Sequence, residues 1–213
     1  MNLEICLKKL QYVGVLNFAT IGEDGAPQVR CISAIHYEPD AMYFFTARGK
    51  NFCRQLRRDG RVQVLAYTMY KEMIRLAGVA FEVSPMEQAR WIDAIFAEQP
   101  YLANVYPDDT RKIGTIFCIR DACVEYFNLG VRPIFRETYA MGAGKVHPKG
   151  YCISDACIDC GICEGVCPQR AIVGEGPRKI MQEHCLHCGS CFEHCPAQAI
   201  VRIDDCSGSA AFG

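Results

Sequence analysis

One cysteine pattern occurs twice in the second half of the chain. It reads Cys-x2-Cys-x2-Cys-x3-Cys-Pro, first from Cys157 and again from Cys185, so the two copies are 28 residues apart. Three cysteines at this spacing can bind three corners of one iron–sulfur cube, whereas the fourth follows too soon to close the same cube and binds the other one. The repeat therefore predicts two [4Fe–4S] clusters, each with ligands from both copies.

The two expected ligand sets follow because each cluster takes three cysteines from one copy and the fourth from the other. One cluster is assigned to Cys157, Cys160, Cys163 and Cys195, and the other to Cys185, Cys188, Cys191 and Cys167. Pro168 and Pro196 end the ligand loops, and Gly161 and Gly189 let backbone amides approach cluster sulfide. Such a protein moves electrons one at a time, which constrains the function of the rest of the chain.

Zinc and disulfides are the alternative uses of these cysteines. Zinc sites usually combine paired Cys-x2-Cys halves into four ligands per ion, which is not the pattern here. Disulfides are disfavoured because the stretch from Met1 to Glu4 has neither the basic region nor the apolar segment of a secretion signal. Residues 148–204 resemble the bacterial two-cluster ferredoxin domain, with both motifs complete.

The remaining cysteines and the composition limit the cellular location and the classes of partner that we expect. Seven further cysteines are expected to be buried or incidental thiols: Cys6, Cys31, Cys53, Cys118, Cys123, Cys152 and Cys206. Thiols and clusters together indicate a reducing, cytoplasmic location. The formal charge of −1 predicts no nucleic-acid partner, and the absence of a long apolar run predicts no membrane span.

A change in composition divides the chain. Glycine and proline gather in residues 131–150, which we expect to be a linker between a domain over 1–130 and a cluster domain over 151–213 with its C-terminal tail. The cluster domain is expected to be a small α+β ferredoxin-like fold. In the first domain the pattern predicts an amphipathic helix around Leu3 to Leu10, and a helix over Pro85–Glu98 with Ser84 as its N-cap.

Most of the first domain has the pattern of β-strands. Strands are expected at Val13–Thr20, Gln28–Tyr37, Ala41–Ala47, Arg61–Met69, Met73–Val83 and Thr115–Asn128. A turn at residues 22–25 joins the first two strands as a hairpin, and a short helix runs to about Arg58. Many short strands with few helices predict an antiparallel β-barrel with peripheral helices.

Basic residues in this domain point to a phosphate-bearing ligand. Lys50 and Asn51 lie where a strand turns into a helix, with Thr46 and Arg48 just before them. Helix N-termini with cations nearby bind phosphate, and Arg30 from a neighbouring strand would add bidentate contacts. The alternative is that each of these residues is an ordinary solvated charge on a strand or turn.

The order of these segments resembles a known family. The stretches at residues 15–20, 24–30, 42–50 and 55–56 are similar to the pyridoxamine-phosphate-oxidase-like FMN-binding split barrel, over residues 1–130. The resemblance implies that Arg30 and Lys50 hold the FMN phosphate, helped by Thr46, Arg48 and Asn51, and that Val29, Cys31, Ile32 and Ser33 line the flavin ring. It also implies a homodimer with flavin at the interface. Vitamin B6 oxidation is disfavoured, because the cluster domain replaces the family's terminal substrate-binding region.

Together the two cofactors suggest an FMN-dependent oxidoreductase. The leading hypothesis is that electrons from a ferredoxin-like donor pass through two [4Fe–4S] clusters to FMN, which reduces an unidentified small molecule. His36 and Tyr37 are candidate proton donors, and Gln63, Tyr67 and Trp91 are lesser candidates for completing the site. The alternatives are an electron-transfer module that shuttles between protein partners without its own substrate, and a split barrel that binds haem or another ligand.

Overall fold

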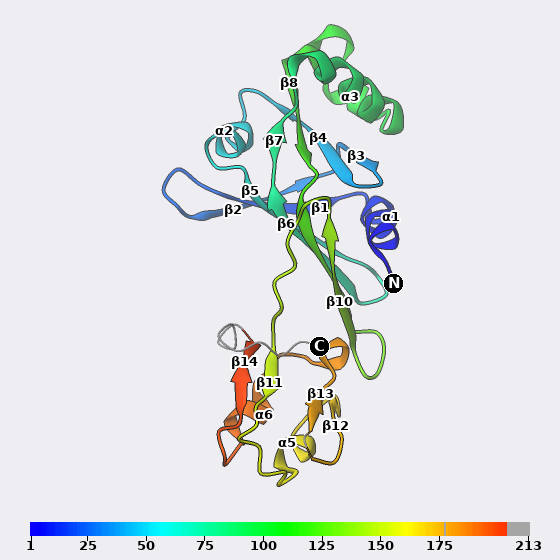
Figure 1. Cartoon of the computed structure of the whole chain (residues 1–213). Helices are drawn as coiled ribbons and strands as arrows, with labels where there is room; N and C mark the ends of the chain where they lie inside the picture. Colours follow the sequence, from blue (N-terminus) through cyan, green and yellow to red (C-terminus); the bar gives the residue numbers. More distant parts are fainter. Residues whose placement is uncertain (177, 204–213) are drawn as a thin grey trace. The chain divides into compact units, whose positions relative to one another are not determined.

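We describe the fold from a computed structural model, which places residues 1–176 and 178–203 (Figure 1). Cys206 and the rest of the C-terminal tail lie outside the described residues. The chain forms two compact units. The first comprises residues 1–69, 73–126 and 138–146, and the second comprises residues 70–72, 127–137 and 147 onward.

The first unit begins with helix α1, Leu3–Val13. The side chain of Asn2 caps it by accepting a hydrogen bond from the amide of Ile5 (2.9 Å), and Gly14 ends it with a φ of 74° that favours glycine. The face with Cys6, Leu7 and Leu10 is buried. This confirms the amphipathic helix that was predicted from the leucine spacing.

Two open sheets make up most of the first unit. The larger has the strand order β10-β9-β6-β5-β1-β2 and the smaller has the order β3-β4-β8-β7. The larger sheet contains β1 (Leu16–Ile21), β2 (Pro27–Ile32), β5 (Arg61–Tyr67), β6 (Glu72–Val79), β9 (Ala122–Asn128) and β10 (Phe135–Met141). The smaller contains β3 (Ile35–Glu38), β4 (Ala41–Ala47), β7 (Phe81–Glu82) and β8 (Gly114–Ile119). The pairs β1–β2, β1–β5, β5–β6, β3–β4, β4–β8 and β7–β8 are antiparallel.

Four predictions about these strands need correction. The single strand expected over Gln28–Tyr37 is two strands in different sheets, because the chain turns at Ser33, whose carbonyl accepts from the amide of Ile35 (2.9 Å). The strand expected over Met73–Val83 is likewise β6 and β7, and the strand expected over Thr115–Asn128 is β8 and β9, in each case in different sheets. The stretch 131–150 contains β10, so part of the expected linker is a sheet strand.

The predicted hairpin turn is confirmed. The amide of Gly22 donates to the carbonyl of Ala26 (2.7 Å), which closes the connection between β1 and β2. Asp24 supports it by accepting from the amide of Ala26 (3.0 Å). Among the strands of residues 1–176 and 178–203, β2 pairs only with β1 and so forms an edge of the larger sheet.

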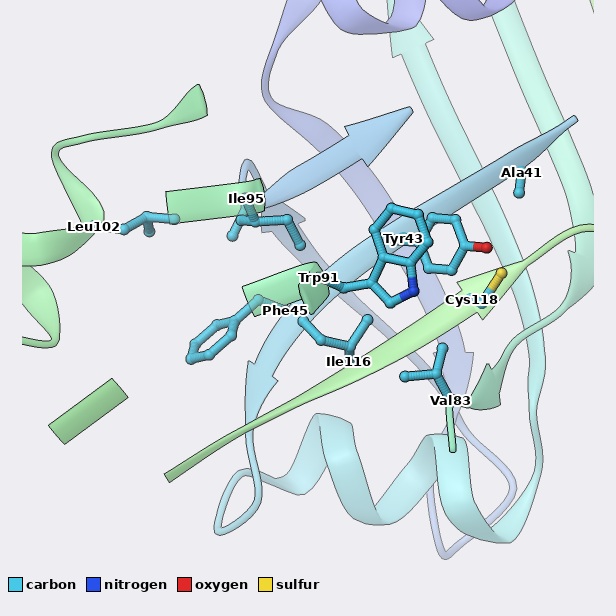
Figure 2. Close-up of a cluster of buried hydrophobic side chains, with 10 residues drawn as sticks. Ala41, Tyr43, Phe45, Val83, Trp91, Ile95, Leu102, Ile116 and Cys118 are labelled. Atoms are coloured by element: carbon cyan, nitrogen blue, oxygen red, sulfur yellow. The ribbon is translucent and has the colours of Figure 1, made fainter. Parts of the chain in front are cut away.

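Helices pack on the smaller sheet and at its ends. Helix α2 (Asn51–Arg58) follows β4, and helix α3 spans Pro85–Glu98 as predicted. The short helices α4 (Leu102–Val105) and η1 (Asp108–Ile113) lead from α3 to β8. Trp91 of α3 stacks on Tyr43 of β4 with ring centroids 3.8 Å apart, in a cluster that buries Ile95, Ile116 and Cys118 completely (Figure 2).

A second aromatic cluster fills the interior of the first unit. The ring of Phe44 lies 4.9 Å from Phe18, 5.8 Å from Phe52 and 5.9 Å from Phe117, measured between centroids. Phe18 and Phe44 are fully buried. These rings join strands of both sheets and helix α2, so the packing of α2 depends on them.

The second unit is built on the repeat. Two small sheets, β11 (Tyr151–Ile153) with β14 (Ile200–Arg202) and β12 (Ile172–Val173) with β13 (Lys179–Ile180), frame the ligand loops. The loops carry the short helices α5 (Ile162–Gly165), η2 (Gln182–His184) and α6 (Ser190–Glu193). Elements of the two copies correspond at the 28-residue offset, for example α5 with α6. In the described part of the chain, no helix is long and apolar enough to cross a membrane.

The aromatic interior gives a stability prediction. Replacing Phe44 with alanine leaves a cavity between three other rings, and we expect a loss of about 3–5 kcal/mol in unfolding free energy. Tyr12→Ala, on an exposed part of α1, is the control and should cost less than about 0.5 kcal/mol. Urea unfolding followed by the fluorescence of Trp91, the single tryptophan, measures the first unit. A loss below about 1 kcal/mol for Phe44→Ala would show that these rings are not the core.

Candidate cofactor sites

Each of two cavities in the second unit is lined by four cysteines. One cavity is lined by Cys157, Cys160, Cys163 and Cys195, and the other by Cys167, Cys185, Cys188 and Cys191. The structure thus brings together the two ligand sets assigned from the sequence, each with three cysteines of one copy and the fourth of the other. In the remaining lining, Ile200 and Ile172 are apolar residues from corresponding places of the repeat.

Backbone amides point at the cysteine sulfurs. The amides of Ala171 and Ala199 lie 3.3 Å from the Sγ atoms of Cys167 and Cys195, respectively. The amide of His187 lies 3.4 Å from Cys185 Sγ. Amide hydrogen bonds to thiolate sulfur tune cluster potentials, so these loops carry groups suited to a cluster as well as its ligands.

Left-handed backbone recurs at corresponding positions of the two loops. Gly161 and Gly189 have φ values of 76° and 82°, and Asp159 and His187 have φ values of 53° and 58°. Such residues reverse the chain tightly, which turns side chains and amides inward. The 28-residue repeat in the sequence is therefore also a repeat in backbone conformation.

Burial raises the pKa of three of these thiols. It raises the pKa of Cys191 to about 11, and it also raises the pKa values of Cys163 and Cys185. Without a metal, burial therefore favours the neutral thiol, although iron needs the thiolate. Bound iron cations would supply the charge that stabilises these thiolates. In residues 1–176 and 178–203 no three His, Cys, Asp or Glu side chains converge on one point as ligands of a single ion.

In the first unit, Arg30 contacts helix α2. Its guanidinium donates to Thr20 Oγ1 (2.5 Å) and to Gln55 Oε1 (2.8 Å), and lies 4.6 Å from the ring centre of Phe52. Gln55 also accepts from the hydroxyl of Thr20 (2.7 Å). The sequence reasoning missed Thr20 and Gln55. A polar residue beside the buried Leu56 in an amphipathic helix was the available signal for Gln55.

The N-terminus of α2 has the properties of an anion site. Lys50 is its N-cap residue in extended conformation, no side chain caps the helix, and its first turn has no acidic residue. The side chains of Lys50 and Asn51 are exposed, and Asn51 accepts from Arg54 (2.7 Å). Uncapped amides with a lysine beside them suit a phosphate group. These residues fit the phosphate of FMN.

Two other predicted phosphate contacts have different surroundings. Arg48 donates to the carbonyl of Gly114 (2.7 Å) and lines a cleft of about 760 Å³ together with Glu82, Arg111 and other residues of α3 and β8. Thr46 is 2% exposed within β4. The structure therefore does not group Arg48 with the side-chain partners of Arg30.

The residues expected to line the flavin ring lie on the edge strand. Val29 is 67% exposed and Cys31 is exposed, while Arg30 and Ile32 are half-buried on the opposite face of β2. Ser33 follows the strand and shares a hydrogen bond with the hydroxyl of Tyr101 (2.5 Å). An exposed apolar residue on an unpaired edge is suited to contact with a ligand or another chain.

The candidate proton donors lie on β3, in the other sheet from Arg30. His36 binds two carboxylates, Glu98 through Nδ1 (2.6 Å) and Glu38 through Nε2 (3.1 Å), and its ring lies 5.2 Å from Trp91. In the described residues the Tyr37 hydroxyl is buried without a hydrogen-bond partner, and burial raises its pKa. Because the strand expected over Gln28–Tyr37 is divided, His36 does not share a strand with Arg30, and a catalytic role for His36 or Tyr37 stays a prediction.

Of the three lesser candidates, one is buried and two are exposed. Trp91 is 4% exposed and is part of the core, whereas Gln63 and Tyr67 lie on the exposed face of β5. Gln63 is opposite Ala19 on β1, whose other neighbour is Val29. Gln63 is thus on the same sheet face as Val29.

The fold and the cysteine cavities define a split-barrel-like unit joined to an iron–sulfur dicluster unit. Two family models match the sequence: Pyridoxamine 5'-phosphate oxidase over residues 6–113 and 4Fe-4S dicluster domain over residues 156–200. The chain belongs to the pyridoxamine 5'-phosphate oxidase family and carries a 4Fe–4S dicluster domain. It is thus a redox protein of the flavoprotein and iron–sulfur type. No curated protein matches the sequence significantly.

Solved structures share the fold of the first unit. A NimC/NimA family protein from Clostridium acetobutylicum is 21% identical with a TM-score of 0.55, covering 65% of this chain and 92% of that one. A general stress protein 26-related protein of the pyridoxinephosphate oxidase family, from the same organism, is 12% identical with a TM-score of 0.51 and coverages of 65% and 96%. A heme binding protein from Mycobacterium smegmatis is 18% identical with a TM-score of 0.53 and coverages of 65% and 57%. These likenesses establish the split-barrel fold.

The left-handed glycines give a test of the ligand loops. Gly161→Ala forces a Cβ atom into left-handed backbone at a cost of about 1–2 kcal/mol, so the iron–sulfur chromophore should bleach about tenfold faster in guanidinium. Gly165→Ala is the matched control, because a Cβ atom there meets no atom within 4 Å and φ is not positive. Equal bleaching rates for both variants would contradict this account of the loop.

Proposed function

We propose that this chain is an FMN-dependent oxidoreductase with two [4Fe–4S] clusters. In this proposal a ferredoxin-like donor would supply single electrons through two clusters held by the second unit to FMN held by the first, for reduction of a small molecule at the interface of a homodimer. The observation that carries it is the pair of cavities with four cysteines each, on a chain whose other unit belongs to the pyridoxamine 5'-phosphate oxidase family.

The combination of cofactors supports an exchange between one-electron and two-electron chemistry. A cubane cluster accepts a single electron, and a flavin accepts one or two. The chain's own contribution is to hold each group and set its surroundings. Cluster ligation is assigned to the eight cysteines of the two cavities, in the crossed sets given above.

The phosphate of FMN is assigned to the N-terminus of α2. Lys50 and the uncapped amides would bind it, with Asn51 at the first helical position. Arg30 is placed against α2 by Gln55 and Thr20, from where its guanidinium can supply a charge-assisted contact. Val29, Cys31, Ile32 and Ser33 are assigned to the ring, Thr46 and Arg48 to supporting positions, and His36 or Tyr37 to proton delivery.

Haem is a second candidate for the first unit. It is favoured by one observation, the similarity to the heme binding protein from Mycobacterium smegmatis. Extraction with acid releases FMN from a flavoprotein, whereas a haemochrome spectrum in alkaline pyridine identifies haem. An electron-transfer module without its own substrate would contain the same FMN and clusters but reduce no small molecule in turnover assays.

The phosphate assignment predicts a selective loss of flavin. The double variant Arg30→Ala/Lys50→Ala removes two cationic contacts of about 1.5–3 kcal/mol each, so the Kd of FMN should rise at least a hundredfold. Iron content should be unchanged. Lys8→Ala, which removes an exposed lysine of α1 paired with Glu4, is the control. Unchanged flavin occupancy in the double variant would overturn the assignment.

The ligand assignment predicts the opposite selectivity. Cys160→Ala removes one thiolate of the first set, so iron should fall from about eight atoms per chain toward four while FMN is retained. The control is Cys152→Ala, because Cys152 lies in β11 and lines neither cavity. Retention of all the iron in Cys160→Ala would show that the ligand sets are wrong.

A further inference from the structure

The repeat allows its two ligand loops to be compared position by position. We call residues 155–166 loop A and residues 183–194 loop B. Loop A has carboxylates at Asp159 and Glu164, where loop B has His187 and Phe192. Loop B carries three histidines (His184, His187 and His194), and the matching positions of loop A carry none. Loops A and B thus have similar backbone conformations but differ in charge.

Another segment of the second unit packs on loop B. His184 Nδ1 donates to the carbonyl of Ile134 (2.8 Å), and the amide of Ile134 donates to Gln169 Oε1 (2.9 Å). Arg136 donates to the carbonyl of the ligand residue Cys185 (3.3 Å). Ile134 is 5% exposed. The part of loop B at His184 and Cys185 is therefore covered by the chain itself, and this cover brings a positive charge to Cys185.

Loop A also presents apolar side chains to solvent. Ile158 is 66% exposed and Ile162 is 44% exposed, and Ile158 lines the cavity of the first cysteine set. The residue of loop B that corresponds to Ile158, Leu186, is half-buried, while Phe192 of loop B is 46% exposed. Cys160 of loop A and Cys188 of loop B are both exposed. Loop A thus differs from loop B in having an exposed isoleucine that lines its cysteine cavity.

Carboxylates surround this apolar surface. Asp155, Asp159 and Glu164 are exposed in loop A. Arg178 binds Asp159 through Nε (2.8 Å) and also pairs with Glu164, but its side chain is only 14% exposed. One largely buried guanidinium thus pairs with two of the three carboxylates, and the outer surface of loop A is negative.

We propose that loop A is the docking surface for a redox partner protein whose own redox centre is surrounded by basic residues. This inference rests on the proposed function, because it needs a cluster held by Cys157, Cys160, Cys163 and Cys195. The partner's basic rim would meet the carboxylates, and Ile158 and Ile162 would form the dry centre of the contact. One electron crosses in each encounter, the cluster and the partner's centre change oxidation state by one, and no bond or proton moves.

Corresponding positions provide a matched pair of variants. Asp155 in loop A corresponds to Glu183 in loop B, so Asp155→Lys and Glu183→Lys make the same charge change at equivalent places. The probe is a cationic c-type cytochrome in the ferric state, each molecule of which accepts one electron from a reduced cluster and becomes ferrous. Anaerobic stopped-flow mixing of the dithionite-reduced holoprotein with this cytochrome gives the rate, with 1,4-benzoquinone as a neutral small acceptor for comparison.

We expect Asp155→Lys to slow cytochrome reduction at least about fivefold at low ionic strength, with the difference disappearing in about 0.5 M salt. Glu183→Lys should stay within about twofold of the wild type, and quinone reduction should be unchanged in both variants. Ile158→Ala should also slow the cytochrome without changing iron content. Equal slowing by Asp155→Lys and Glu183→Lys, or no slowing by Asp155→Lys, would overturn the docking assignment. Failure of the proposed function is distinguishable, because iron or flavin would then be missing before mixing.

Discussion

Each cysteine cavity is completed by a residue from the other copy of the repeat, and the second unit depends on this crossing. Cys195 closes the cavity of the first copy, and Cys167 closes that of the second. Neither copy alone supplies all four cysteines of one cavity, so both copies must fold together to form either site. Because burial raises the pKa values of Cys191 and Cys185, bound iron would supply the charge that makes this packing compatible with thiolates. Both cavities thus lie in one small unit, and each depends on both copies of the repeat.

In the first unit, the candidate phosphate site depends on the position of helix α2. Its first turn is uncapped and flanked by Lys50, and its buried face packs through Phe52 against the aromatic core. Arg30 contacts the same helix through Gln55. The core therefore positions both the N-terminus of α2 and the residue of α2 that Arg30 contacts, which links the packing of this unit to its suitability for a phosphate group.

The sequence predicted local features better than it predicted where the chain changes sheets. Helix α3 and strand β4 have the expected bounds, because periodicity and capping are local. The prediction of a single strand through Arg30 and His36 was wrong, because the turn at Ser33 depends on pairing with strands that are distant in the sequence. The two cysteine sets could be predicted because the spacing of the ligands along the chain reflects the geometry of the cluster. The partners of Arg30 could not, because they depend on how α2 packs. The cover over loop B has no sequence signal, because residues 127–137 were expected to be a strand end and a linker.

The central claim is that one chain holds both FMN and two clusters that exchange electrons. An anaerobic reductive titration of the purified protein, followed by its visible spectrum and by electron paramagnetic resonance, tests it most directly. We predict uptake of about four electrons per chain, two by flavin and one by each cluster. Uptake of only about two, with either the flavin or the cluster signals absent, would contradict the account.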